Sequence, residues 1–462
     1  MAVGADGTLK IHHARFLVTV DPERRIIRDG SILVRGQRIV QVGKAAELEP
    51  VAADRVIDAR HLVVTPGFVN GHLHVSYAHA VRGLFPDDLG PAYLSNVFAL
   101  QGAMTEEEEY LTSLLAITEL LKYGTTCLLD PGSTKYLDAG MAAYQQSGCR
   151  IIVGRHVTDR PNPVNLPVSS TAHAIEQMQQ TIESYDHRLD DRVRAWAMPF
   201  SPVFCSPELL VAAKGLADQY RTGLTTHFNN SRQYVQSCVE ERGQRPAQYL
   251  ESLGVLGGNV ALAHCLGIDL SEVQCLARNG AAAVVCPTAA IKGGAGITHN
   301  GLLPELLQQG VTVGLGTDAG NNSNLLETMR SMYLAAVLYK DARQDVSMIP
   351  AETALELATI GGATALGLGA DIGSIEVGKK ADLVLFDTRR PEWSALFNPV
   401  NSLVYNADGR SVHTVLVDGR VVVENHQPQF VDEIDLIQQV QRLGENLVSR
   451  VGVSYPSRWP VI

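Results

Sequence analysis

The run Pro66-Gly67-Phe68-Val69-Asn70-Gly71-His72-Leu73-His74 decides the fold of this chain. An apolar stretch leads into two histidines one residue apart, and a β-strand places such side chains on the same face. Two neutral imidazoles on one face can bind a divalent transition metal. The run therefore predicts a strand that carries part of a metal site, and further ligands are expected at the ends of other strands.

Seven more apolar, strand-like runs follow, with helical patterns between them. They are Thr125–Leu129, Arg150–Val157, Val193–Pro199, Gly223–Phe228, Val260–Cys265, Ala281–Cys286 and Val311–Thr317. The clearest helix is expected at Thr105–Lys122, where Thr105 and Glu108 match a capping box and Gly124 ends the helix. Eight strand–helix units over about 250 residues predict an α/β fold, a (β/α)8 TIM-like barrel. A doubly wound sheet is the structural alternative.

Both ends of the chain are rich in short β-type runs, unlike the alternating middle. Ser31–Val34 and Arg38–Val42 lie near the N-terminus, and Ala381–Phe386 and His413–Val423 lie near the other end. The three expected parts are a composite β-sandwich domain from residues 1–61 and 374–430, a metal-dependent barrel from 62–373, and a C-terminal helix and tail, residues 431–462, packed on the barrel or on a neighbouring subunit.

Composition narrows the class of protein. The chain has 462 residues, of which 45% are hydrophobic and 19% charged, so a large core is expected. A net charge of −11 argues against nucleic acid or an anionic membrane as partner and favours a small-molecule substrate. No signal peptide and no spanning helix are expected. The seven scattered cysteines predict buried thiols in a reducing cytoplasm.

Three further polar residues end strands of the predicted barrel, where the functional residues of such barrels lie. His227 is expected as a third metal ligand. Asp318 can bind a metal and also accept a proton from water, although a helix N-cap is the alternative. His264 is either a further ligand or a group that polarises the scissile carbonyl. For each histidine, the alternative is a buried or loop side chain that hydrogen-bonds locally.

Substrate contacts are predicted at His156, near the end of the third strand, and at His79 and Arg82, which follow the first pair of histidines. A packed loop histidine is the alternative interpretation of His156. Specificity is expected to reside in the loops Phe85–Leu100, Asp159–Ser170 and Asn229–Gln244.

The donor set predicts one divalent metal ion, and zinc, cobalt and iron(II) suit nitrogen-rich ligation alike. Water on such an ion becomes a nucleophile near neutral pH because its pKa falls to about 7. Asp318 is expected to accept the proton as this water attacks an sp2 carbon. His264 and the ion are expected to stabilise the resulting oxyanion.

Five segments make the chain resemble the amidohydrolase superfamily, in the branch of triazine hydrolases, guanine deaminase and cytosine-deaminase-like enzymes. They are Pro66–His74, Leu262–Cys265, Cys286–Thr288, Gly314–Asp318 and Gly373–Leu383, in family order across residues 9–424. The resemblance implies the barrel, the composite sandwich, frequent homo-oligomers and a mononuclear centre on His72, His74, His227 and Asp318.

Two departures from the family pattern narrow the expected reaction. Val193–Pro199, the fourth strand, has no lysine to bridge two metals, which disfavours a binuclear centre. Asn230 stands where the deaminases carry a glutamate that passes a proton to the ring, and an amide cannot do this. Ring deamination is therefore disfavoured, and Asn230 is expected to contact substrate.

The favoured reaction is hydrolysis of a small, partly apolar phenylurea or thiocarbamate, of the kind that degrades herbicides. One alternative is an aminohydrolase or chlorohydrolase acting on a triazine, purine or pyrimidine. An alternative of another class is a non-catalytic relative that binds or assembles. The presence together of His72, His74, His227, His264 and Asp318 argues against that last alternative.

Overall fold

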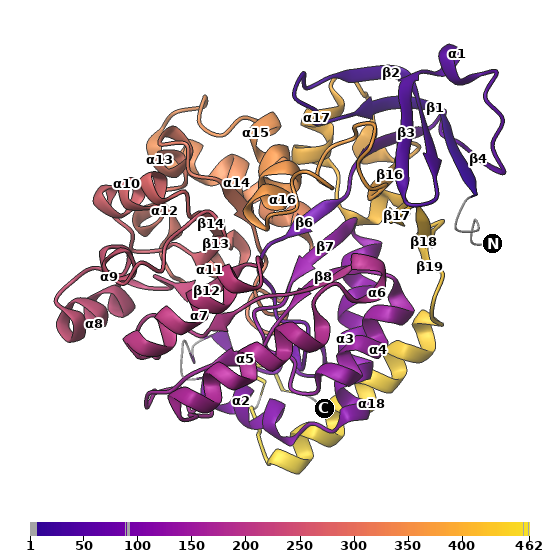
Figure 1. Ribbon diagram of the computed structural model, residues 1–462. Helices are drawn as coiled ribbons and strands as arrows, with labels where there is room; N and C mark the ends of the chain where they lie inside the picture. Colours follow the sequence, from indigo (N-terminus) through magenta and orange to yellow (C-terminus); the bar gives the residue numbers. More distant parts are fainter. Residues whose placement is uncertain (1–6, 88, 90–92, 456, 461) are drawn as a thin grey trace.

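The computed structural model describes residues 7–87, 89, 93–455, 457–460 and 462 (Figure 1). Residues 1–6 of the expected N-terminal domain lie outside the described residues. So do positions 88 and 90–92 of the expected pocket loop, and positions 456 and 461 of the C-terminal tail.

Parallel strands form two four-stranded sheets in the middle of the chain, ordered β10-β8-β7-β6 and β12-β13-β14-β15. Their bounds are β6 (Phe68–Asn70), β7 (Thr125–Leu129), β8 (Arg150–Val153), β10 (Val193–Ala195), β12 (Leu224–Phe228), β13 (Val260–His264), β14 (Ala282–Val285) and β15 (Val313–Leu315). The short strands β9 (His156–Val157) and β11 (Met198–Pro199) pair with each other beyond β8 and β10.

Hydrogen bonds join the two sheets at both seams. At one seam, the Ala197 N–H donates to the Gly223 carbonyl at 3.0 Å, and the Thr225 N–H donates to the Ala197 carbonyl at 3.1 Å. At the other, the Gly71 N–H donates to the Leu315 carbonyl at 2.8 Å. The predicted (β/α)8 barrel is therefore confirmed, with all eight strands parallel.

Helices follow the strands and cover the outside of the barrel (Figure 1). The main ones are α2 (Leu94–Ala103), α3 (Glu106–Lys122), α4 (Leu137–Ser147), α5 (Thr171–Tyr185), α7 (Pro207–Gln219), α8 (Arg232–Arg242), α9 (Pro246–Ser252), α10 (Leu270–Asn279), α13 (Leu303–Gln308) and α14 (Thr328–Arg343). The capping box predicted for α3 is present. The Thr105 hydroxyl accepts from the Glu108 N–H at 3.3 Å, and the Glu108 carboxylate accepts from the Thr105 N–H at 2.9 Å.

The two ends of the chain form one nine-stranded sheet, ordered β19-β18-β17-β16-β5-β1-β2-β3 with β4 paired to β1. The bounds are β1 (Thr8–Val18), β2 (Ile26–Arg35), β3 (Arg38–Lys44), β4 (Arg55–Asp58), β5 (Leu62–Pro66), β16 (Leu383–Asp387), β17 (Val412–Val417), β18 (Arg420–Glu424) and β19 (Gln427–Pro428). The expected barrel start at residue 62 differs from the structure, because β5 pairs with β1 and β16 in this sheet. The first barrel strand begins at Phe68.

A buried ionic group fixes the terminal sheet to the barrel. Arg150, at the start of β8, donates to Asp382 from Nε at 2.9 Å and from Nη2 at 3.1 Å. The same guanidinium hydrogen-bonds Asp418, and Lys380 lies 3.5 Å from that carboxylate. The side chains of Arg150, Asp382 and Asp418 are each at least 95% buried, so the terminal sheet and the barrel share an interior. We call Arg150, Asp382 and Asp418 the junction group.

The C-terminal helix α18 (Glu433–Val451) lies along the barrel beside α3 (Figure 1). Leu447 packs among the buried side chains around Tyr77 and Leu100, and Lys122 pairs with Glu433 at 2.6 Å. This is the barrel-packed arrangement that was one of the two expected. Within the described residues, no helix has the length and apolar character needed to cross a membrane.

Candidate metal and catalytic site

His72 and His74 lie just beyond β6, which ends at Asn70, so the expectation that they lie within a strand is wrong. The neighbouring strands nevertheless hold this segment. The His72 carbonyl accepts from the Asp318 N–H at 2.9 Å, while the Leu73 N–H donates to the Leu129 carbonyl at 3.0 Å. The two histidine rings consequently lie 5.2 Å apart, edge to face.

His227 reaches the same place from the carboxyl end of β12. Its Nδ1 donates to the Phe200 carbonyl at 3.0 Å, since that oxygen can only accept. Nε2 of the neutral ring is then an acceptor, which is the form in which histidine binds a metal. The His72 and His227 rings lie 5.0 Å apart.

His264, the last residue of β13, and Asp318, three residues after the end of β15, have an unusual backbone conformation. Their φ angles are 79° and 62°, a region that side chains other than glycine rarely adopt. Such conformations cluster at functional sites, where the surrounding structure holds them. Here they turn the two side chains toward His72 and His74. The His72 and His264 rings lie 4.9 Å apart, and Asp318 Oδ1 lies 3.3 Å from His74 Nε2.

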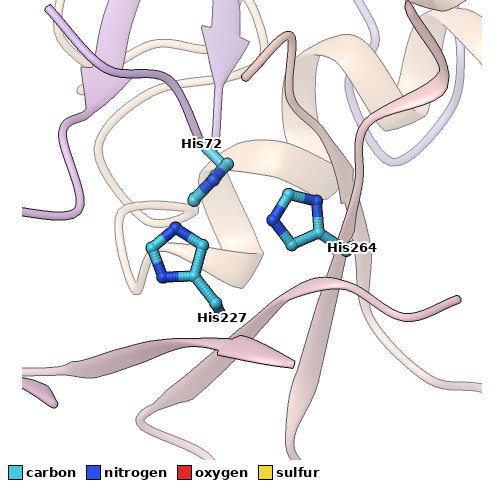
Figure 2. Close-up of side chains that lie close together, drawn as sticks. All are labelled: His72, His227 and His264. Carbon is cyan, nitrogen blue, oxygen red and sulfur yellow. The ribbon is translucent and has the colours of Figure 1, made fainter. Parts of the chain in front are cut away.

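The structure therefore brings together the five residues predicted at the centre of the site. Figure 2 shows His72, His227 and His264 converging from three different strand ends. Their ligand nitrogens lie within 4.8 Å of one another, and so do the ligand atoms of His72, His74 and Asp318. We call these five residues the mouth cluster.

The pKa shifts in the mouth cluster favour the protonation states that bind a cation. Burial lowers the pKa of His72 and His227 well below the usual value of 6.5, and the neighbouring imidazole of His264 lowers it further. Burial also lowers the pKa of His264. Burial raises the pKa of the Asp318 carboxyl, but the hydrogen bond from His74 and the nearby imidazoles lower it more, so the net pKa is well below its usual value. Neutral imidazoles and an ionised carboxylate are the forms that bind metals.

Unpartnered atoms support the same conclusion. Both ring nitrogens of His72 and Nδ1 of His74 are buried and make no hydrogen bond within the described chain. Buried polar atoms are nearly always paired, so atoms like these mark a place for a bound group. Two triads of donors that share His72, one with His227 and His264 and the other with His74 and Asp318, suit a divalent transition metal. The residues present therefore fit the expected ion.

Three positioning contacts were missing from the sequence prediction. Asn322 donates through Nδ2 to Asp318 Oδ2 at 2.8 Å, and the Ala319 N–H donates to Oδ1 at 2.7 Å. Asn70 donates to the Thr317 hydroxyl at 2.8 Å and so connects β6 to the segment that carries Asp318. The asparagine-rich run after Asp318 was the available sequence signal for Asn322.

His156, for which a substrate contact stays a prediction, lies beside the mouth cluster. Its ring packs 5.3 Å from Phe200, whose own ring stacks on His227 at 4.4 Å. Burial and then the neighbouring His74 lower the pKa of His156 to about 3, so this ring is neutral. Its Nδ1 is buried and makes no hydrogen bond within the described chain.

His79 and Arg82 bind a carboxylate of the protein. His79 Nε2 lies 2.8 Å from Glu119 Oε2, and Arg82 pairs with the same oxygen. Burial raises the pKa of Glu119, but His79 and Arg82 lower it more, to about 2. The structure thus gives both residues an internal partner on α3, which the sequence did not indicate.

Asn230 is exposed, in the loop after β12, while its neighbour Asn229 is fully buried. Asn229 donates to Glu272 at 3.2 Å and has a positive φ of 48°. The loop is therefore anchored through residue 229, and Asn230 lies on its solvent side.

The amidohydrolase family matches residues 63–422, so this chain belongs to that family. It is accordingly an enzyme, a metal-dependent hydrolase that acts on carbon–nitrogen bonds other than peptide bonds, and the non-catalytic alternative is set aside.

Curated relatives resemble the chain over nearly its whole length. A 5-methylthioadenosine/S-adenosylhomocysteine deaminase of Syntrophobacter fumaroxidans is 31% identical over 433 residues, covering 93% of this chain and 96% of the relative. A 5'-deoxyadenosine deaminase of Methanobrevibacter smithii is 30% identical over 447 residues, covering 96% and 98%.

Solved structures give the same family resemblance. An adenosine deaminase of Xanthomonas campestris with bound zinc has a TM-score of 0.85 at 28% identity, covering 96% of this chain and 98% of that one. An atrazine chlorohydrolase of Arthrobacter aurescens TC1, complexed with zinc, has a TM-score of 0.85 at 25% identity, covering 94% and 100%. Both of these neighbours contain bound zinc.

Proposed function

We propose that this protein is an aminohydrolase that replaces an exocyclic amino group of a nitrogen heterocycle by oxygen. The mouth cluster is the observation that carries the proposal, because it gathers metal donors and a carboxylate base at one point. The relatives support a ring substrate, since they are named as deaminases of adenosine derivatives. The heterocycle alternative from the sequence is therefore preferred over the phenylurea and thiocarbamate interpretation.

We assign His72, His74, His227 and Asp318 as the ligands of one divalent ion. His264 approaches from β13, the strand next to the one that carries His227, and its nitrogen lies within 4.8 Å of those of His72 and His227. It can therefore bind the same ion or donate to the oxygen that develops negative charge. When bound, the ion supplies a water molecule whose pKa is lowered to about 7.

Asp318 has the position and charge of the general base. Its carboxylate is ionised and is oriented by Asn322 and the Ala319 N–H. In the proposed reaction, Asp318 takes a proton from the attacking water as the water oxygen bonds to the ring carbon that bears the amino group. The proton then passes to the amino group, the carbon–nitrogen bond breaks, and ammonia leaves. The oxygen stays on the ring as a hydroxyl, and its proton moves through solvent to the neighbouring ring nitrogen, which gives the carbonyl form.

Aromatic side chains lie beside the mouth cluster. Phe200 stacks on His227, and the Phe204 ring lies 5.8 Å from that of Phe200 and is nearly parallel to it. His156, whose ring packs 5.3 Å from Phe200, adds a buried Nδ1 that makes no hydrogen bond within the described chain. A planar heterocycle with polar edges matches these surroundings, because aromatic faces stack and a lone nitrogen selects a donor or acceptor.

Asn230 favours a second candidate function. The glutamate expected in a deaminase would protonate a ring nitrogen, and Asn230 cannot do so. Hydrolysis of an acyclic phenylurea or thiocarbamate needs no such proton. This alternative predicts turnover of ureas or thiocarbamates and none of heterocycles.

A substrate panel separates the two candidates. Zinc-loaded protein is incubated with an adenosine-type nucleoside, an aminotriazine, a phenylurea and a thiocarbamate, and products are followed by mass spectrometry and ammonia release. The proposal expects ammonia from a heterocycle, and an Asp318→Asn preparation provides the blank. Turnover confined to the urea or the thiocarbamate would establish the second candidate instead.

A further inference from the structure

A second group of metal-binding side chains lies in the terminal sheet, apart from the mouth cluster. It consists of His12 and His13 in β1 and Glu49, which follows the short helix α1 (Ala45–Leu48). Figure 1 shows β1 and α1 at the outer end of the terminal sheet, away from the barrel strands. The site proposed above uses none of these residues.

The backbone of β1 is altered where the two histidines lie. Consecutive residues of a regular strand point to opposite faces of the sheet. Here the pairing of β1 with β2 shifts between Ile11 and Ala14, which inserts one extra residue, a β-bulge. His13 takes a positive φ of 60° within this bulge. The result is that the rings of His12 and His13 lie only 4.1 Å apart, although their positions are adjacent.

Each histidine has a partner for the ring nitrogen that faces away from Glu49. His13 Nδ1 lies 2.8 Å from Asp29 Oδ1, and His12 Nδ1 lies 2.7 Å from the Ser31 hydroxyl. Because a carboxylate only accepts, Nδ1 of His13 carries the proton, and Nε2 of the neutral ring is free to act as a ligand. Histidines that bind metals almost always have their second nitrogen held in this way.

The two Nε2 atoms converge on one carboxylate oxygen. Glu49 Oε2 lies 2.8 Å from His12 Nε2 and 3.7 Å from His13 Nε2. Around a tetrahedral zinc ion, ligand atoms at about 2.0–2.1 Å from the metal lie about 3.4 Å from one another. The observed separations bracket that value, so small side-chain rotations suffice to admit an ion.

The loop that carries Glu49 is fixed independently of the histidines. Lys10 donates through Nζ to the Leu48 carbonyl at 3.1 Å and to the Val51 carbonyl at 2.8 Å. These two bonds hold the chain on either side of Glu49. The Glu49 side chain itself is 66% exposed, which leaves room for water to complete a coordination shell.

We propose that His12, His13 and Glu49 form a second divalent-metal site, which takes zinc or a similar transition ion with water in the remaining position. Two imidazoles and one carboxylate are a known ligand set for zinc, and the nitrogen donors select against magnesium and calcium. The ion joins β1 to the connection between β3 and β4. Its distance from the barrel strands gives it a structural role rather than a catalytic one.

Metal counting tests the proposal without reference to activity. Metal-free protein is equilibrated with zinc chloride, dialysed and measured by elemental analysis. Wild-type protein should hold two zinc ions per chain, His13→Ala should hold one, and His72→Ala should hold the other one. His173→Ala is the matched control, because His173 lies 3.3 Å from Glu176 on an exposed helix face and belongs to no cluster. It should hold two ions.

Glu49→Gln is a second variant in case His13→Ala does not fold. It changes an exposed side chain and leaves the bulge intact. This variant should also hold one ion, and zinc should raise its melting temperature less than that of the wild type. If His13→Ala and Glu49→Gln bind as much zinc as the wild type, with the same affinity, the cluster is only a hydrogen-bonded network and the proposal is wrong. The proposal is also wrong if the wild-type chain holds one zinc ion and only His72→Ala loses it.

Discussion

The mouth cluster and the junction group both consist of buried ionisable side chains, but these side chains differ in whether they have partners. In the junction group, every charge has an opposite charge within 4 Å, and Arg150 donates to two carboxylates. In the mouth cluster, both ring nitrogens of His72 have no hydrogen-bond partner within the described chain. An unpaired buried polar group costs about 1–3 kcal/mol, and a bound metal ion would supply the bonds that the two His72 nitrogens lack. The comparison distinguishes groups that hold the fold together from groups that await a ligand.

Replacing the base is expected to give the largest effect on the mouth cluster. Asp318→Asn should lower turnover by about 10²–10⁴-fold, the range for loss of a general base, while leaving the fold intact. Steady-state rates on the best substrate of the panel, together with thermal unfolding, measure both properties. Asp345→Asn, on the surface, is the control and should keep full activity. Near-normal turnover by Asp318→Asn would remove the assignment of this residue as base.

Breaking the junction group should lower the stability of the fold strongly, whereas replacing Asp318 should lower turnover. Arg150→Ala leaves Asp382 buried without its cation and Asp418 with only the more distant Lys380 and Arg192, which is expected to cost about 3–5 kcal/mol. Urea denaturation gives this difference in the free energy of unfolding. Arg410→Ala removes an exposed pair with Asp408 and should cost less than about 1 kcal/mol. Equal losses in the two variants would mean that the junction group does not anchor the sheet.

A third test concerns Glu109, a buried carboxyl group on α3. Burial raises its pKa to about 7, and its Oε2 accepts from the Lys135 N–H at 2.9 Å. The folded protein thus binds this proton more tightly than the unfolded chain does. The resulting stabilisation is present below about pH 4.5 and is lost as the pH rises through 7.

Glu109→Gln should therefore gain stability relative to the wild type between pH 5 and pH 8, by up to about 3 kcal/mol, because one pKa unit corresponds to about 1.4 kcal/mol. Urea titrations of both proteins at the two pH values give the difference. Glu352→Gln, an exposed substitution on α15 (Ala351–Glu356), is the control. An unchanged difference between pH 5 and pH 8 would show that Glu109 does not titrate in this window.

The smallest expected effect is at Asn322, which orients Asp318. Asn322→Ala should lower activity or metal affinity by about 10–100-fold, as is usual when a residue behind a metal ligand is lost. In a competition titration with a chromophoric chelator, the variant should bind zinc more weakly than the wild type does. Asn401→Ala, at an exposed position, serves as the matched control. If the variant keeps the zinc affinity and the turnover rate of the wild type, Asn322 does not position Asp318 for metal binding or catalysis.

The sequence predicted the barrel well because its signals are local. Each apolar run marks a strand, and the capping box at Thr105 and Glu108 marks the start of α3, where the structure also begins it. The segmentation was less accurate. β5 belongs to the terminal sheet, since only its pairing with β1 and β16 decides this, and pairing between distant strands leaves no local mark.

The centre of the site was also predictable, because strand ends converge in a closed barrel. The partners of the site residues were not. Glu119 lies 40 positions from His79, and the Phe200 carbonyl lies 27 positions from His227; packing alone brings these groups together. The bulge that pairs His12 with His13 is likewise invisible in a sequence where both positions look like ordinary strand residues.

The most direct test of the central claim is a zinc titration of the metal-free Glu49→Gln variant, followed by ammonia release from an adenosine-type nucleoside. This variant keeps the mouth cluster and lacks the second proposed site. Turnover should be absent without zinc, rise in proportion to added zinc, and level off at one ion per chain. Turnover in the metal-free protein, or none at any zinc concentration, would contradict a mouth cluster that binds one metal ion to hydrolyse a heterocycle.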